Sequence, residues 1–133
     1  MPEIHSKSVN VGPTLFCAEV GGHKLFAEAP SNFGGTGMAP TPPQALVATR
    51  ANCVGMVVSI ACRAKGLDYA GMIVEVTADL DPTNHKVENF QATVHMPGEI
   101  TEALRRTVEA SHEMCSIGNT LCCANVVEVT LAE

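Results

Sequence analysis

The feature that most constrains this chain is a helix-forming stretch at residues 43–65 that is apolar on almost every side. Pro42 and Pro43 suit its first turn, alanine is frequent within it, and Gly66 suits its end. At about 100° per residue, one narrow stripe carries Leu46, Arg50, Cys53, Val57 and Ile60. The opposite side carries Ala48, Ala51, Val54, Gly55, Val58 and Cys62. A helix that is apolar all round needs cover on all sides, so we expect it at the centre of the fold.

Length and composition favour one ordered domain spanning residues 1–133. A chain of 133 residues is long enough to bury a substantial core without disulfide staples. Its 46% apolar and 17% charged residues differ from the polar, highly charged composition of disordered chains.

Charge and hydropathy exclude several classes of partner. A net charge of -6 with 4% aromatic residues provides neither the basic patch nor the stacking platform of a nucleic-acid binder. The longest nearly unbroken apolar run, residues 54–62, has about half the length that crosses a bilayer. The first residues show no signal-peptide pattern, so we expect a cytoplasmic protein without a membrane partner.

The chain has six cysteines, and their spacing does not match a paired zinc-knuckle motif. They stand at positions 17, 53, 62, 115, 122 and 123. Without secretory features we expect reduced thiols rather than disulfides, and neither a metal nor a cofactor.

The elements around the central helix predict the α+β class, with antiparallel sheets. Residues 1–30 are predicted to form strands around a Gly21-Gly22 hairpin turn, and residues 31–42 a breaker-rich loop, long enough to act as a lid. Residues 68–96 predict a second hairpin turning at residues 81–84. Residues 99–115 show the periodicity of an amphipathic helix ended near Gly118, and residues 126–131 predict a final strand.

Two cysteines have charged or titratable neighbours at helical spacing. Arg50 stands three residues before Cys53, where a cation would favour the thiolate. An arginine on an apolar stripe needs a partner, so we expect it to pair with Cys53 or a carboxylate, or to face a cleft. His112 stands three residues before Cys115 and could assist proton transfer.

The remaining cysteines have weaker grounds for a chemical role. Cys62 points away from Cys53 on the same predicted helix, and Cys17 alternates with Phe16 in a predicted strand, so both are expected in the core. Cys122 and Cys123 are candidates for a back-up redox role.

Two segments resemble the OsmC/Ohr family of osmotically inducible and organic-hydroperoxide-resistance proteins. The first is Pro40-Thr41-Pro42-Pro43-Gln44-Ala45-Leu46-Val47-Ala48 followed by Ala51-Asn52-Cys53, and the second is His112-Glu113-Met114-Cys115-Ser116-Ile117-Gly118-Asn119-Thr120-Leu121. The resemblance implies an α+β fold with a long central helix, and an intertwined homodimer with active sites at the subunit interface. It also implies a peroxiredoxin-like reaction in which Cys53 attacks a hydroperoxide, Cys115 forms a disulfide with it, and a dithiol reductant restores both thiols.

The sequence departs from the pattern of this family near both cysteines. No arginine precedes Arg50, Pro43-Gln44 occupies the place of a glutamate, and Ser116 stands where many members have proline. We therefore hypothesise that Arg50 supplies the missing cation, with Gln44 and His112 as further supporting residues. Two alternatives stay open: a non-catalytic small-molecule binder, and a redox sensor in which the disulfide changes conformation without turnover.

Overall fold

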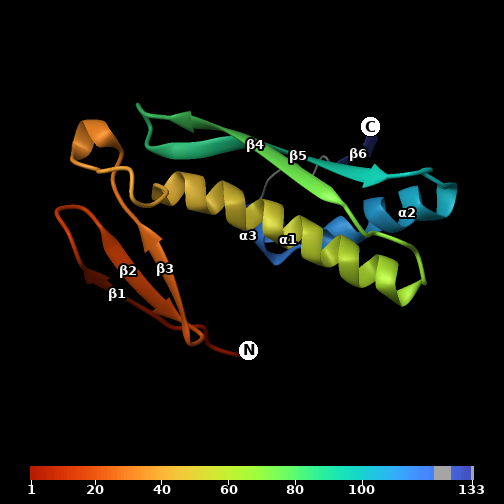
Figure 1. The fold of residues 1–133 in the computed structure, drawn as a ribbon, viewed down its shortest axis with the longest axis horizontal. Helices are drawn as coiled ribbons and strands as arrows, with labels where there is room; N and C mark the ends of the chain where they lie inside the picture. Colours follow the sequence, from red (N-terminus) through yellow and green to blue (C-terminus); the bar gives the residue numbers. More distant parts are fainter. Residues whose placement is uncertain (122–126, 133) are drawn as a thin grey trace. The chain divides into compact units, whose positions relative to one another are not determined.

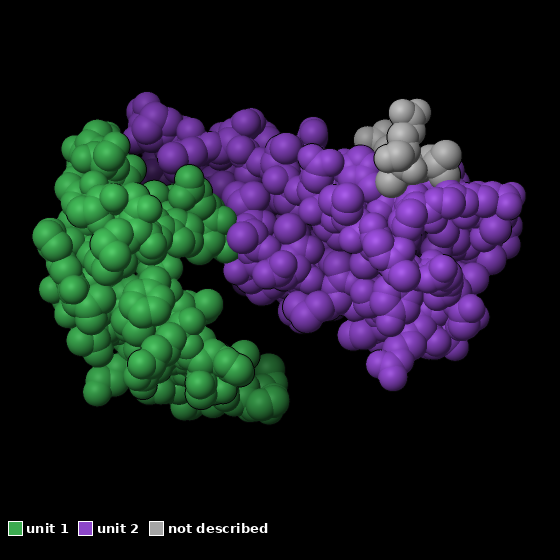
Figure 2. Space-filling model, viewed as in Figure 1, with its two compact units in different colours: residues 1–46 green, residues 47–133 purple. Residues whose placement is uncertain are grey.

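The structure is a computed structural model that describes residues 1–121 and 127–132, with side chains described for residues 1–121. Within the predicted domain the chain forms two compact units, Met1–Leu46 and Val47–Glu133 (Figure 2).

The first unit contains an antiparallel sheet of three short strands in the order β1, β2, β3 (Figure 1). Their bounds are Ser6–Asn10, Phe16–Val20 and His23–Ala27. The predicted hairpin turn is confirmed, because Gly21 and Gly22 adopt φ values of 57° and 78°, which side chains disfavour and glycine tolerates.

The loop after this sheet is organised around the buried carboxylate of Glu28. The short 3₁₀ helix η1, Ser31–Phe33, lies within this region. One Glu28 oxygen accepts hydrogen bonds from the backbone N–H and hydroxyl of Thr36, both at 3.1 Å, and the other accepts from the N–H groups of Met38 and Ala39. The Thr36 N–H and the other donors outweigh burial and hold the pKa of Glu28 below its ordinary value of 4.5. The loop therefore has its own polar core.

Glycine is required at one position of this loop by a close backbone approach. A Cβ atom added to Gly35 would lie 1.7 Å from the carbonyl oxygen of Ala29. The glycine-rich composition thus reflects tight local folding around Glu28.

The predicted central helix is confirmed as α1, Pro42–Ala64. At its start Thr41 and Gln44 cap one another: the Gln44 Oε1 accepts from the Thr41 N–H at 2.9 Å, and the Thr41 hydroxyl accepts from the Gln44 N–H at 3.4 Å. At its end Gly66 has a φ of 66° and the Leu67 N–H returns to the Cys62 carbonyl at 2.9 Å.

By length and composition alone, α1 could also cross a membrane, with a mean hydropathy of 1.6. Six of its residues lie buried, and we read it as a core helix: Arg50, Cys53, Val54, Val57, Val58 and Cys62. The expectation of burial on every side is wrong for this chain alone, because the side chains of Met56 and Ile60 are 59% and 58% exposed.

The second unit has a mixed three-stranded sheet in the order β4, β5, β6. Strands β4, Ile73–Asp81, and β5, Lys86–Pro97, form the predicted hairpin, with a bulge between Thr77 and Asp79. The final strand β6, Val127–Ala132, pairs parallel to β5, so the sheet is not wholly antiparallel.

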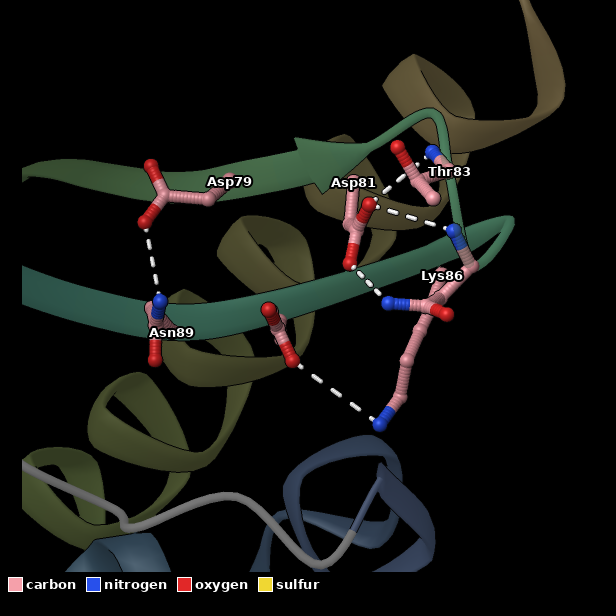
Figure 3. A network of polar contacts seen from close by, with 7 residues as sticks. Asp79, Asp81, Thr83, Lys86 and Asn89 are labelled. Carbon is pink, nitrogen blue, oxygen red and sulfur yellow. Dashed lines mark hydrogen bonds and ion pairs between the residues drawn. The ribbon is translucent and has the colours of Figure 1, made fainter.

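A local polar network closes the β4–β5 hairpin (Figure 3). Asp81 accepts hydrogen bonds from the N–H groups of Thr83 and Asn84 at 2.9 and 3.1 Å and from the Asn84 side chain at 2.7 Å. These bonds lower the pKa of Asp81, and the bond from the Asn84 side chain contributes most. A further bond at 2.9 Å joins Asn89 to Asp79 across the two strands. The predicted turn at residues 81–84 is thereby explained by aspartate turn chemistry.

The predicted helix over residues 99–115 is wrong in its extent. Helix α2 covers Glu102–Ser111, and Thr101 caps it by accepting from the Leu104 N–H at 3.1 Å. A 3₁₀ turn η2, His112–Met114, and a short helix α3, Ser116–Leu121, follow. Side chains compete for the last α2 carbonyls, because the Ser111 hydroxyl bonds to the Val108 carbonyl at 2.7 Å and a His112 ring nitrogen contacts the Glu109 carbonyl.

One apolar cluster joins α1, β5 and α2. Its fully buried members at 0 or 1% exposure are Val54, Val58, Cys62, Val94, Met96, Val108 and Cys115. Cys62 is a core residue, as predicted, while Cys17 is half-buried. This cluster fixes the inner face of α1, on which Arg50 and Cys53 lie.

The Glu28 network predicts an acid-sensitive loop. Because the folded-state pKa is lowered, the stabilisation is present above the ordinary value of 4.5 and is lost as pH falls through the folded pKa. We expect Glu28→Gln to give several-fold faster amide hydrogen exchange at Thr36, Met38 and Ala39 at neutral pH, measured by mass spectrometry. The matched change Glu19→Gln, at an exposed position in β2, should leave exchange unchanged. Unaltered protection in Glu28→Gln would contradict this account.

Candidate functional site

Two sulfurs that lie far apart in the sequence meet in the core of the second unit. The Sγ atoms of Cys53, on α1, and Cys115, between η2 and α3, are 2.9 Å apart. Both residues are buried, at 9% and 0% exposure, and both are free thiols. Two thiols this close can form a disulfide once one of them is oxidised.

A buried arginine stands beside this pair. Arg50 is 2% exposed and lies one turn before Cys53 on α1. Its Nη1 donates to the sulfur of Cys115 at 2.8 Å. Arg50 was expected to pair with Cys53 or a carboxylate, or to face a cleft, and the structure shows a hydrogen bond to Cys115, the sulfur that lies against Cys53. A guanidinium is always charged in proteins, so it favours a thiolate at this position.

Cys115 is held at the start of α3 rather than on a continuous helix. Its backbone is extended, with φ of -79° and ψ of 99°, and its sulfur accepts from the Gly118 N–H at 3.4 Å. This is the geometry of a side chain capping a helix N-terminus, with the acceptor three residues before the donor. The N–H of Ile117 bonds to Cys53. Sequence reasoning missed both amides; it assigned Gly118 to helix termination, whereas Gly118 lies inside α3.

The surroundings push the two sulfurs in opposite directions. Burial, followed by the hydrogen bond with Cys115, raises the pKa of Cys53 above its ordinary value of 9.0. Burial also opposes ionisation of Cys115, but the Cys53 thiol, the Gly118 N–H and Arg50 together lower the pKa of Cys115. Of the two thiols, Cys115 is therefore the one that ionises more readily.

The other predicted site residues have local roles. The half-buried His112 has its ring nitrogen against the Glu109 carbonyl rather than a sulfur. Gln44, on the exposed side of α1, caps that helix through Thr41. Cys122 and Cys123 lie outside the described residues. Within the part of the chain that the structure describes, no three His, Cys, Asp or Glu side chains are grouped to hold a metal ion.

The sequence matches a protein family, and the fold matches solved structures. A family model described as OsmC-like protein matches residues 35–131. No curated protein matches the chain by sequence.

Three solved structures are similar over almost the whole chain. An OsmC-like protein from Mycoplasma pneumoniae is 16% identical, with a TM-score of 0.79, 99% of this chain and 99% of that chain covered. The organic hydroperoxide resistance protein OhrB of Bacillus subtilis is 17% identical, with a TM-score of 0.64 and 98% of each chain covered. An organic hydroperoxide resistance protein OsmC from Legionella pneumophila is 19% identical, with a TM-score of 0.67, 100% of this chain and 98% of that chain covered.

These likenesses confirm the predicted α+β architecture with a long helix, at identities that mark a divergent sequence. The family model covers 97 residues, from 35 to 131, of the 133. The chain therefore belongs to the family of OsmC-like proteins.

Proposed function

We propose that this protein is a peroxiredoxin-like thiol enzyme that reduces organic hydroperoxides with Cys53 as the attacking sulfur and Cys115 as the resolving sulfur. The observation that carries the proposal is the 2.9 Å separation of the two buried sulfurs beside the charged Arg50. The names of the similar proteins from Bacillus subtilis and Legionella pneumophila, which refer to organic hydroperoxide resistance, support this choice of substrate class.

The reaction uses two thiols and one hydroperoxide. The Cys53 sulfur attacks the terminal oxygen, the O–O bond breaks, and the product is an alcohol with a sulfenic acid on Cys53. Cys115 then attacks the sulfenic sulfur, releasing water and forming a disulfide. A cellular dithiol reduces the disulfide by exchange and becomes oxidised itself.

We further propose that the protein acts as a homodimer in the cytoplasm. The outward face of α1 carries the exposed side chains of Met56 and Ile60, and beside it lies a groove of 720 Å³ between α1 and β4. The groove is lined mainly by small or apolar residues such as Gly55 and Met72. Exposed apolar surface on a helix of this length favours cover by another chain, and a second copy would supply it symmetrically.

Peroxide turnover tests the proposed activity. With a dithiol reductant, the wild-type protein should consume an organic hydroperoxide such as cumene hydroperoxide catalytically. Cys53→Ser should lower kcat/KM by at least about 100-fold, since loss of a nucleophile removes the covalent route. The matched control Cys62→Ser removes another buried α1 thiol and should retain activity. Equal activity in both variants would contradict the assignment.

Disulfide mapping tests the pairing. One equivalent of hydroperoxide, without reductant, should link Cys53 to Cys115, as identified by mass spectrometry of peptides. A linkage formed without catalytic turnover would instead indicate a redox sensor, and no linkage would indicate a non-catalytic binder.

The oligomeric state tests the proposal that a second copy of the chain covers the apolar face of α1. Light scattering after size exclusion should give twice the chain mass for the wild type. Ile60→Glu should shift the protein toward monomers, because it places a charge in the proposed apolar interface between the two copies. Lys65→Glu, an exposed change beyond the groove, should leave the dimer intact. A monomeric wild type would rule the dimer out.

A further inference from the structure

The two sulfurs differ in their contact with Arg50 and in their exposure to solvent. Cys115 accepts a hydrogen bond from the cationic Arg50 but is 0% exposed, while Cys53, 2.9 Å away, is 9% exposed. Attack on a hydroperoxide requires a thiolate at the sulfur that the hydroperoxide can reach. A proton must therefore leave Cys53 before or during the attack.

Resting on the proposed function, we propose that Cys115 is the base that accepts this proton from Cys53, and that Arg50 is the positioning residue that keeps Cys115 charged for the task. Cys115 thus acts in the first chemical step as well as in resolution.

The hydrogen bonds around Cys115 are those of a thiolate. Its sulfur accepts from Arg50 Nη1 at 2.8 Å and from the Gly118 N–H at 3.4 Å, and the Cys53 sulfur lies 2.9 Å away. A thiol sulfur is a weak acceptor, whereas a guanidinium and a backbone N–H that converge on one sulfur stabilise a negative charge. With Cys115 ionised in this way, the proposal places the proton between the two sulfurs on Cys53.

No other base acts on Cys53 among residues 1–121, whose side chains the structure describes. The charged or titratable groups around Cys53 are Arg50, from α1, and Cys115, from the junction between η2 and α3. The remaining polar groups are the N–H groups of Ile117 and Gly118, which are donors. The His112 ring bonds to the Glu109 carbonyl. Cys115 is thus the acceptor that the site provides.

The proton moves from Cys53 to Cys115 as the Cys53 sulfur attacks the terminal oxygen and the O–O bond breaks. The leaving alkoxide takes the proton from Cys115 and becomes an alcohol. Cys53 is now a sulfenic acid, and Cys115 is again a thiolate beside Arg50. It attacks the Cys53 sulfur, the S–O bond breaks, and the departing hydroxide gains a solvent proton to form water. A dithiol then supplies two electrons to the disulfide.

This mechanism makes the pH dependence a property of the pair. The reactive form has one proton shared by two sulfurs, so the rate of sulfenic acid formation follows the loss of the first proton from the pair. Without Cys115, the rate follows ionisation of Cys53 alone, which burial disfavours.

Single-turnover kinetics test the proposal. Sulfenic acid formation at Cys53 is measured across pH by quenching the reaction with dimedone and mapping the adduct by mass spectrometry. Cys115→Ser should move the rate profile to higher pH by at least about one unit, a loss of about tenfold at neutral pH. Cys115→Ala should do the same, and Cys62→Ser should follow the wild type. Circular dichroism checks that each variant is folded.

Two kinetic results would overturn the proposal. Cys115→Ser reacting with the wild-type rate and pH profile would leave Cys115 only a resolving thiol. Cys53→Ser forming a sulfenic acid on Cys115 at the wild-type rate would make Cys115 the attacking sulfur.

A measurement without peroxide separates this proposal from the proposed function. In reduced protein labelled with ¹³C at cysteine Cβ, the neutral-pH chemical shifts should be those of a thiolate at Cys115 and a thiol at Cys53. Arg50→Lys, which keeps a cation but loses the guanidinium fork, should raise the pH at which Cys115 ionises. A thiolate at Cys53 instead would overturn the proposal even in an active enzyme. If no hydroperoxide is consumed but these shifts are found, the proposed function fails while the shared proton stands.

Discussion

The contact between the buried Arg50 guanidinium and the Cys115 sulfur is the interaction on which the site depends. A permanent positive charge in an apolar core is costly unless a negative partner lies beside it. Because Cys115 supplies that partner, its pKa is lowered while the pKa of Cys53 is raised. The redox chemistry proposed for the pair, and the order in which protons move, both follow from this placement.

Packing and local hydrogen bonds bring the partners together from separate elements. The apolar cluster of α1, β5 and α2 holds the face of α1 that carries Arg50 and Cys53. On the other side, the end of α2 is interrupted by side-chain bonds to its last carbonyls, and the chain turns through η2. This break lets Cys115 cap α3 and directs the Gly118 N–H at its sulfur. A continuous helix through Cys115 would have satisfied that N–H within the helix instead.

Several features could be predicted because they depend on residues close in sequence. The bounds of α1 follow from Thr41, Gln44 and Gly66, the hairpins from Gly21-Gly22 and Asp81, and the inward direction of Cys53 from helical periodicity. Periodicity misled at residues 112–115, since it records which side chains are apolar and carries no information on competition for backbone carbonyls. The exposure of Met56 and Ile60 escaped prediction because the cover for an apolar face need not come from the same chain.

The sequence by itself determined the class of fold, the central helix and the two candidate thiols, because these depend on local propensity, capping and periodicity. Only the tertiary structure decided that Arg50 bonds to Cys115, a residue sixty-five positions further along the chain. It also placed the arginine beside the more deeply buried of the two sulfurs. The physical reason is that a pKa depends on all the donors and charges around an atom, and these come from segments more than sixty residues apart in the chain.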